Sequence, residues 1–177
     1  WGDEGKDLVV KSSLNIQIAK QQLISEGNYY AASSLTYPVI ETIDDSSTGA
    51  GQIFPETAQK AIGFGIIQGI VSRDDLEIPE NVSIDPQTSD LQSQAYIWNR
   101  LRDDVEFNIQ VETLNILVSA KNVVGRTDFE SFSEQEIKKT LARYNGNLVS
   151  DDGTVNSGVE TYGNQVYQLY QAFLQNS

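Results

Sequence analysis

The stretch from Asp104 to Val124, DVEFNIQVETLNILVSAKNVV, predicts the central element of the fold. As a helix it would be roughly 31 Å long. Apolar residues such as Phe107, Val111 and Leu117 recur on every side of such a helix, and an element that is apolar all round is normally buried. Gly125 follows where glycine commonly ends a helix. The sequence therefore predicts a buried central helix near residues 104–124.

The segments on either side of this helix also have helical patterns. Ser89 with Gln92, and Ser133 with Glu136, have the spacing of capping boxes, in which side chains satisfy the first free backbone groups of a helix. The expected helices lie near residues 6–25, 55–62, 91–101, 133–144 and 159–173, and residues 72–88 are expected to form an irregular surface loop. We expect a mainly α fold in a single domain, residues 1–177, with a small β-hairpin or irregular element near residues 38–53.

Charge and composition exclude several classes of function. The chain of 177 residues has 12 Lys and Arg against 25 Asp and Glu, a formal net charge of −13, so it lacks the basic surface that binds nucleic acid. The absence of histidine and cysteine removes the usual nucleophile–base pairs and the commonest ligands of transition metals. We therefore expect no metal and no cofactor. An acid or base acting near neutral pH must be a carboxyl, tyrosine or lysine, which favours glycosidases.

Features related to location follow from the same composition. The apolar run Ala61–Val71 is the longest in the chain and is too short to span a bilayer, so we expect no membrane insertion. The chain starts at Trp1 and has no methionine, so we expect a mature or trimmed form from which a signal peptide was removed. We expect an extracytoplasmic location, secreted, periplasmic or associated with the cell wall, which the absence of cysteine suits.

Carboxylates and glycines gather between residues 40 and 58. Glu41, Asp44 and Asp45 precede a glycine-rich run in which Gly49 and Gly51 leave room for a ligand to approach the backbone. Such a layout suits the floor of a binding cleft. It also suits a plain turn before a helix that starts with proline, so spacing alone leaves both interpretations open.

Four patches of sequence, in order, resemble the lytic transglycosylases and goose-type lysozymes of the lysozyme-like superfamily. The segment Gly51–Ala58, GQIFPETA, is similar to that family's Gly-Leu-Met-Gln-Ile-x-Pro-x-Thr-Ala motif, and Glu41-Thr42 stands in the place of its catalytic Glu-Ser pair. Three later segments resemble others of the family, namely Asp103–Ile109, Ala142–Gly146 and Tyr162–Leu169. The resemblance implies a lysozyme-like α+β fold.

The resemblance also implies roles for individual residues. Glu41 would be the general acid that protonates the glycosidic oxygen, held in a partly apolar pocket that keeps it protonated near neutral pH. The substrate would be the β-1,4 glycan strands of peptidoglycan, cleaved by a monomer. After cleavage, the sugar's own hydroxyl would close an anhydro ring, or Asp44 or Asp45 would activate water. Substrate contacts would come from Gly51, Gln52, Ile53, Tyr144 and Asn145.

A weaker likeness leads to a second assignment. The segment Tyr37–Asp45, YPVIETIDD, is similar to a tyrosine-rich segment of chitosanases. This likeness implies that Glu26 of this chain would be the acid and Asp44 or Asp45 the base. The net charge of −13 repels anionic peptidoglycan at long range and favours cationic chitosan. A third interpretation is a non-catalytic module that binds glycan on the same scaffold. We favour Glu41, because two later motifs match the transglycosylase pattern.

Overall fold

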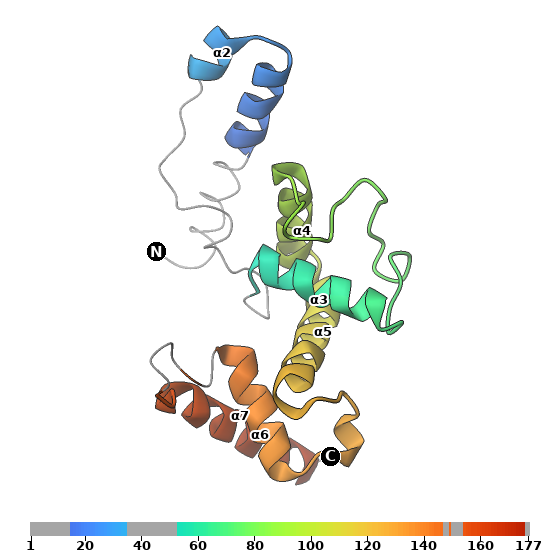
Figure 1. The fold of residues 1–177 in the computed structure, drawn as a ribbon, viewed down its shortest axis with the longest axis vertical. Helices are drawn as coiled ribbons and strands as arrows, with labels where there is room; N and C mark the ends of the chain where they lie inside the picture. The colour runs from blue at the N-terminus through green and yellow to red at the C-terminus, as the bar shows by residue number, and fades with distance from the viewer. Residues whose placement is uncertain (1–14, 35–52, 147–148, 150–153, 176–177) are drawn as a thin grey trace. The chain divides into compact units, whose positions relative to one another are not determined.

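The computed structural model describes residues 15–34, 53–146, 149 and 154–175, and their fold is mainly helical, as the sequence predicts. An antiparallel bridge pairs Val149 with Val155. The hairpin expected near residues 38–53 lies outside the described residues except for Ile53. The helices are residues 15–25, α2 (Tyr29–Ser34), α3 (Pro55–Ile67), α4 (Leu91–Asp103), α5 (Val105–Val124), the short 3₁₀ helix η2 (Phe129–Ser131), α6 (Glu134–Asn145) and α7 (Ser157–Gln175) (Figure 1).

The chain divides into two compact units, Trp1–Glu112 and Thr113–Ser177. The boundary falls inside α5, so the first unit holds the helices up to the first turns of α5, and the second holds the remainder of α5 with α6 and α7. Each unit is described separately below. The expectation of a single domain stays a prediction.

The core of the first unit is built from α3, α4 and the start of α5. Ile62 of α3, Trp98 and Leu101 of α4, and Phe107 of α5 are fully buried. The connection from α3 to α4, expected as a surface loop, contributes Leu76 to this core. It is irregular, as predicted, but it buries Ile78 and Val82 as well as Leu76.

Two arginines hold this irregular connection in place. The guanidinium of Arg73 donates to the carbonyl oxygens of Pro79 at 2.8 Å and Val82 at 3.0 Å. Arg100 of α4 donates to the carbonyl of Glu77 at 3.3 Å. The Pro79 carbonyl also accepts from the Val82 N–H at 3.0 Å, so side-chain and backbone donors together pair the carbonyl groups of this connection.

The burial of α5 differs from the expectation. Phe107, Val111 and Leu114 are buried, and their i, i+4, i+7 spacing places them on one face of the helix. Val105 is 63% exposed and Ile109 is 52% exposed, so the prediction of burial on all sides is wrong for the first turns. The helix itself, from Val105 to Val124, and its end at Gly125, which has a φ of 85°, are confirmed.

The starts of α6 and α4 differ in how well the predicted capping boxes agree with the structure. The capping box of α6 is confirmed, since Ser133 Oγ accepts from the Glu136 N–H at 3.4 Å and Glu136 Oε2 accepts from the Ser133 N–H at 2.8 Å. The predicted cap at Ser89 is wrong. Asp90 caps α4 instead, with its Oδ1 accepting from the Ser93 N–H at 2.7 Å, while Ser89 Oγ accepts from Gln59 Nε2 at 2.6 Å.

In the second unit, α6 and α7 lie side by side, coloured orange and red in Figure 1. Gly163 of α7 lies in close contact with α6. A Cβ atom at Gly163 would lie 2.5 Å from the carbonyl oxygen of Lys138 and 2.8 Å from the Cβ of Ala142. Only a residue without a side chain fits this crossing, so Gly163 sets the distance between the two helices.

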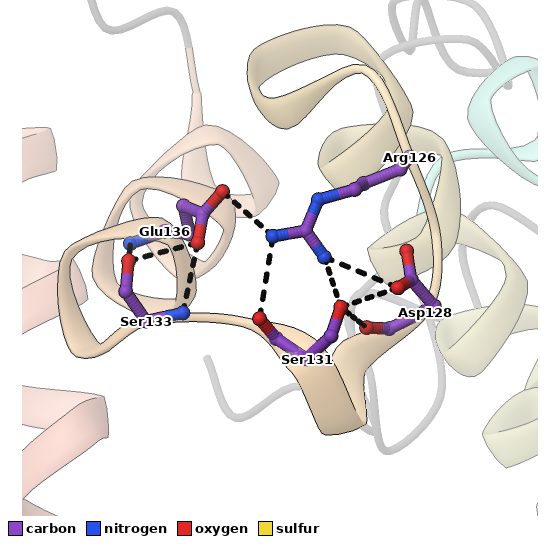
Figure 2. A network of polar contacts seen from close by, with 5 residues as sticks. All are labelled: Arg126, Asp128, Ser131, Ser133 and Glu136. Atoms are coloured by element: carbon purple, nitrogen blue, oxygen red, sulfur yellow. Dashed lines mark hydrogen bonds and ion pairs between the residues drawn. The ribbon is translucent and has the colours of Figure 1, made fainter.

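A polar network around Arg126 fixes the entry into α6 (Figure 2). Its guanidinium pairs with Asp128 at 3.2 Å and with Glu136 Oε1 at 2.9 Å, and also contacts the hydroxyl of Ser131. Hydrogen bonds from Ser133, with the charge of Arg126, hold the pKa of the Glu136 carboxyl below its ordinary value. The network ties the connection after α5 to the first turn of α6.

Candidate functional site

Most of the carboxylates and glycines expected to form the active site fall in one segment outside the described residues. Glu41, Asp44, Asp45, Gly51 and Gln52 all belong to residues 35–52. Their roles stay predictions. The described parts of the expected site are Glu26, Ile53, Tyr144 and Asn145.

Glu26 lies directly after the helix of residues 15–25. Its side chain is exposed, and its Oε1 accepts a hydrogen bond from Gln22 Nε2 at 3.0 Å. Its backbone N–H donates to the Gln22 carbonyl at 3.0 Å, which continues the helical turn. Gly27 follows with a φ of 77° and ends the helix, next to the end expected near residue 25. Glu26 is therefore a helix-end carboxylate in contact with its own helix.

Ile53 anchors the start of α3 from inside the core. The whole residue is only 3% exposed, so little of its surface is open to a substrate. Phe54 precedes the helix in an extended conformation, and Pro55 is the first helical residue, as expected. The burial of Ile53 and the start of α3 at Pro55 therefore fix the described part of the GQIFPETA segment.

Tyr144 and Asn145 stand together on the last turn of α6. Tyr144 is half-buried and Asn145 is exposed. The helix closes through the Gly146 N–H, which donates to the Arg143 carbonyl at 3.2 Å, and Arg143 Nη1 donates to the Gly146 carbonyl at 3.3 Å. The structure brings these two predicted residues to one helix end in the second unit, whereas Glu26 and Ile53 belong to the first unit.

A groove runs along the α6–α7 pair, with a volume of about 590 Å³. This volume lies in the range of small-molecule sites. Its polar walls come from both helices and its apolar parts from Ala142 and the bridged valines. The lining residues are Glu134, Gln135, Lys138, Lys139 and Ala142 of α6, Glu160 and Asn164 of α7, and Val149 and Val155.

The charged side chains of this groove differ in how they are paired. Lys138 Nζ lies 2.5 Å from Glu134 Oε1 and 5.0 Å from the centre of the Tyr167 ring. Among the residues that the structure describes, no hydrogen-bond or ion-pair partner exists for the side chains of Lys139, Glu160 and Asn164. The groove therefore offers an ammonium, a carboxylate and an amide to a ligand.

Apart from Ala142, which belongs to the Ala142–Gly146 segment, these groove residues were not predicted to form a site. The signal that could have found them is the spacing of Glu134, Lys138 and Ala142 at i, i+4 and i+8, next to the amphipathic final helix. The sequence does not indicate that α6 packs against α7. Glu160 and Asn164 lie beside the α6 residues only because the two helices cross at Gly163.

The described ranges lack two features that would define the class of site. They contain no cluster of three or more His, Cys, Asp or Glu side chains that could hold a metal ion. They also contain no helix with the length and apolar character needed to cross a membrane. Compared with family models, curated proteins and solved structures, the chain matches none of them.

Proposed function

We propose that the chain is a glycosidase of the lysozyme-like superfamily, with that superfamily's α+β fold, and that it cleaves the β-1,4 bond between N-acetylmuramic acid and N-acetylglucosamine in peptidoglycan. The observation that carries the proposal is the order of the four patches that resemble lytic transglycosylases and goose-type lysozymes. Three of these patches coincide with ends of observed helices, and one of them, Asp103–Ile109, spans the end of α4 and the start of α5. GQIFPETA runs into the start of α3, and ARYNG covers the end of α6.

The chemistry proposed for Glu41 is general acid catalysis. Its carboxyl proton passes to the glycosidic oxygen as the bond from that oxygen to the anomeric carbon breaks. In the transglycosylase route, a hydroxyl of the same sugar then attacks the anomeric carbon and its proton returns to Glu41, which closes an anhydro ring. In the lysozyme route, Asp44 or Asp45 stabilises the cation or takes the proton of an attacking water. Tyr144 and Asn145 would position the acid and an N-acetyl group.

The proposed substrate implies a location. Peptidoglycan lies outside the cytoplasmic membrane, so the proposal includes an extracytoplasmic protein, acting on glycan strands as a monomer. The absence of cysteine and histidine restricts the general acid to the carboxyl, tyrosine and lysine groups considered above.

The test is mass spectrometry of the soluble products released from purified peptidoglycan by the wild type, by Glu41→Gln and by Glu26→Gln. We expect anhydro-muropeptides from the wild type and a loss of roughly 100-fold or more in Glu41→Gln, the usual scale of a lost general acid. The Glu26→Gln variant is the matched control and should keep its activity. Products with reducing ends would make the enzyme a lysozyme and bring Asp44 or Asp45 forward as the base.

A second candidate function is favoured by charge. At −13 the chain is attracted to cationic chitosan and repelled by anionic cell-wall polymers. Under that assignment Glu26 is the acid and Asp44 or Asp45 the base. Release of chitosan oligomers that is lost in Glu26→Gln and kept in Glu41→Gln, with no release from peptidoglycan, would replace the first proposal with the second.

A further inference from the structure

The strongest feature outside the proposed catalytic segment is an unpaired cation. Among the Lys and Arg residues within the described ranges, Lys139 alone has no hydrogen-bond or ion-pair partner. Every other described Lys or Arg has a partner. Glutamates pair with Lys60 and Lys138, and aspartates pair with Arg100, Arg102 and Arg126. Carbonyl oxygens accept from Lys121, Arg73 and Arg143, and Lys20 has a partner as well. The chain has 25 acidic residues against 12 basic ones, and the Lys139 ammonium has neither a carboxylate nor a carbonyl partner among the described residues. Lys139 lies in the α6–α7 groove.

The other helix of the groove contributes the opposite charge. Glu160 of α7 lines the groove, and neither its carboxylate nor the amide of Asn164 has a partner in the described part of the chain. Two lysines and two glutamates line the groove, so their charges cancel, whereas the whole chain has a formal net charge of −13. A purely anionic or purely cationic ligand would therefore meet repulsion from half of these groups.

The third component of the groove is apolar. Val149 is 51% exposed and Val155 is 64% exposed, and the two are joined by the antiparallel bridge. Both line the groove together with Ala142. Half-exposed valines beside free charges of both signs form a surface for a ligand that carries a small apolar group between an acidic and a basic end.

We infer that this groove binds a short zwitterionic peptide, with a carboxylate of the peptide on Lys139, an amine on Glu160 and a small apolar side chain over Val149 and Val155. The identity of the peptide rests on the proposed function. The glycan strands of peptidoglycan carry short peptides with free carboxylates, free amines and alanine side chains, which is the chemistry that the groove complements. The groove would then hold the peptide while a separate segment acts on the sugar.

The test measures binding of the tetrapeptide L-Ala–γ-D-Glu–L-Lys–D-Ala to the full-length chain by isothermal titration calorimetry. Three variants are compared, Lys139→Gln and Glu160→Gln in the groove and Lys60→Gln as the matched control. Lys60 is an exposed lysine of α3 that lies outside the groove. We expect roughly five-fold weaker binding for each groove variant, the scale of one exposed ion pair, and unchanged binding for Lys60→Gln.

A change in the ligand checks the assigned contact. The same tetrapeptide with its carboxylates converted to amides should bind the wild type more weakly by a similar factor, and should bind Lys139→Gln no more weakly than the unmodified peptide does. Equal binding of the unmodified peptide to the wild type and to Lys139→Gln would overturn the inference, as would the absence of any binding heat with the wild type.

The two proposals fail separately. Tetrapeptide binding that depends on Lys139, combined with no cleavage of peptidoglycan or chitosan, would keep the groove and reject the glycosidase. Cleavage that depends on Glu41, combined with no tetrapeptide binding, would keep the glycosidase and reject the groove as a peptide site. Neither Lys139 nor Glu160 belongs to the proposed catalytic machinery, so their variants should keep cleavage of peptide-free glycan at the wild-type rate.

Discussion

Asp104 is a single residue that serves two helices. Its backbone N–H donates to the Arg100 carbonyl at 2.9 Å and closes α4, while its Oδ1 accepts from the Phe107 N–H at 3.0 Å and opens α5. Its Oδ2 also pairs with the guanidinium of Arg100 at 2.8 Å and 3.1 Å. The backbone bond from Phe107, and then the pair with Arg100, hold the pKa of the Asp104 carboxyl below its ordinary value.

Replacing Asp104 separates its role as a helix cap from its role as an ion-pair partner. Asp104→Ala removes both, and we expect the free energy of unfolding to fall by about 1–2 kcal/mol, the usual cost of a lost cap. Asp104→Asn keeps an oxygen that can cap α5 and loses only a partly exposed ion pair, so the loss should stay within about 1 kcal/mol. Urea unfolding followed by circular dichroism measures both, and an equal loss in the two variants would show that the ion pair, not the cap, is what stabilises this junction.

At the scale of elements, the pairing of α6 with α7 depends on Gly163. Gly163→Ala places a Cβ 2.5 Å from the Lys138 carbonyl oxygen, so the helices must separate. We expect a net loss of about 1–3 kcal/mol in unfolding free energy, the scale of overpacking, even though alanine is the better helix former.

Gly158 of α7 offers the matched control for this prediction. The nearest atom that a Cβ at Gly158 would meet is Asn156 Oδ1, at 3.5 Å, which is an ordinary contact. Gly158→Ala should therefore leave stability unchanged or raise it slightly, since alanine loses less backbone entropy than glycine. The measurement is the thermal midpoint of each variant, and a Gly163→Ala midpoint at or above that of Gly158→Ala would contradict the close crossing.

Helix positions were predictable from local sequence where the signals were local. The Ser133–Glu136 capping box and the stop at Gly125 depend only on neighbouring residues, and both are confirmed. The predicted cap at Ser89 failed because Gln59, thirty residues away in the chain, takes up the Ser89 hydroxyl. α3 continues past its expected end near residue 62 and runs to Ile67. Gly63 and Gly65, which favour a helix exit, lie inside the helix.

The candidate site shows the same limit more strongly. The order of motifs predicts Glu41 and its neighbours as site residues, which stays a prediction, and the structure adds the burial of Ile53 and the helix-end placement of Tyr144 and Asn145. The α6–α7 groove was not predictable in this way. Its two walls come from helices whose contact requires a glycine crossing, and an amphipathic pattern indicates that a helix packs without indicating on what.

At the scale of the whole molecule, acid conditions should destabilise the chain. Hydrogen bonds from the Ser72 side chain lower the pKa of Asp75, those from the Ser131 side chain lower the pKa of Asp128, and those from Ser133 lower the pKa of Glu136. A carboxyl with a lowered pKa in the folded state contributes stability above its unfolded value, and this contribution is lost as the pH falls through the folded value.

The ordinary values are 3.8 for aspartate and 4.5 for glutamate, and the chain has no histidine to titrate between pH 5 and 7. We therefore expect the free energy of unfolding to change little between pH 7 and pH 5 and to decrease steadily below about pH 4. Urea unfolding at pH 7, 5 and 3 checks this. A large loss already between pH 7 and pH 5 would mean that groups other than these carboxyls control the acid response.

Because α5 is continuous, it determines where the protein can be divided into two fragments. The division between the compact units falls between Glu112 and Thr113, inside a helix of 20 residues. Proteases cleave best at exposed loop tips, and the hydrogen-bonded interior of a helix resists them. Limited digestion would therefore not report this division, and an expression clone of either half needs the whole of α5, from Val105 to Val124, to avoid starting or ending in an open helical turn.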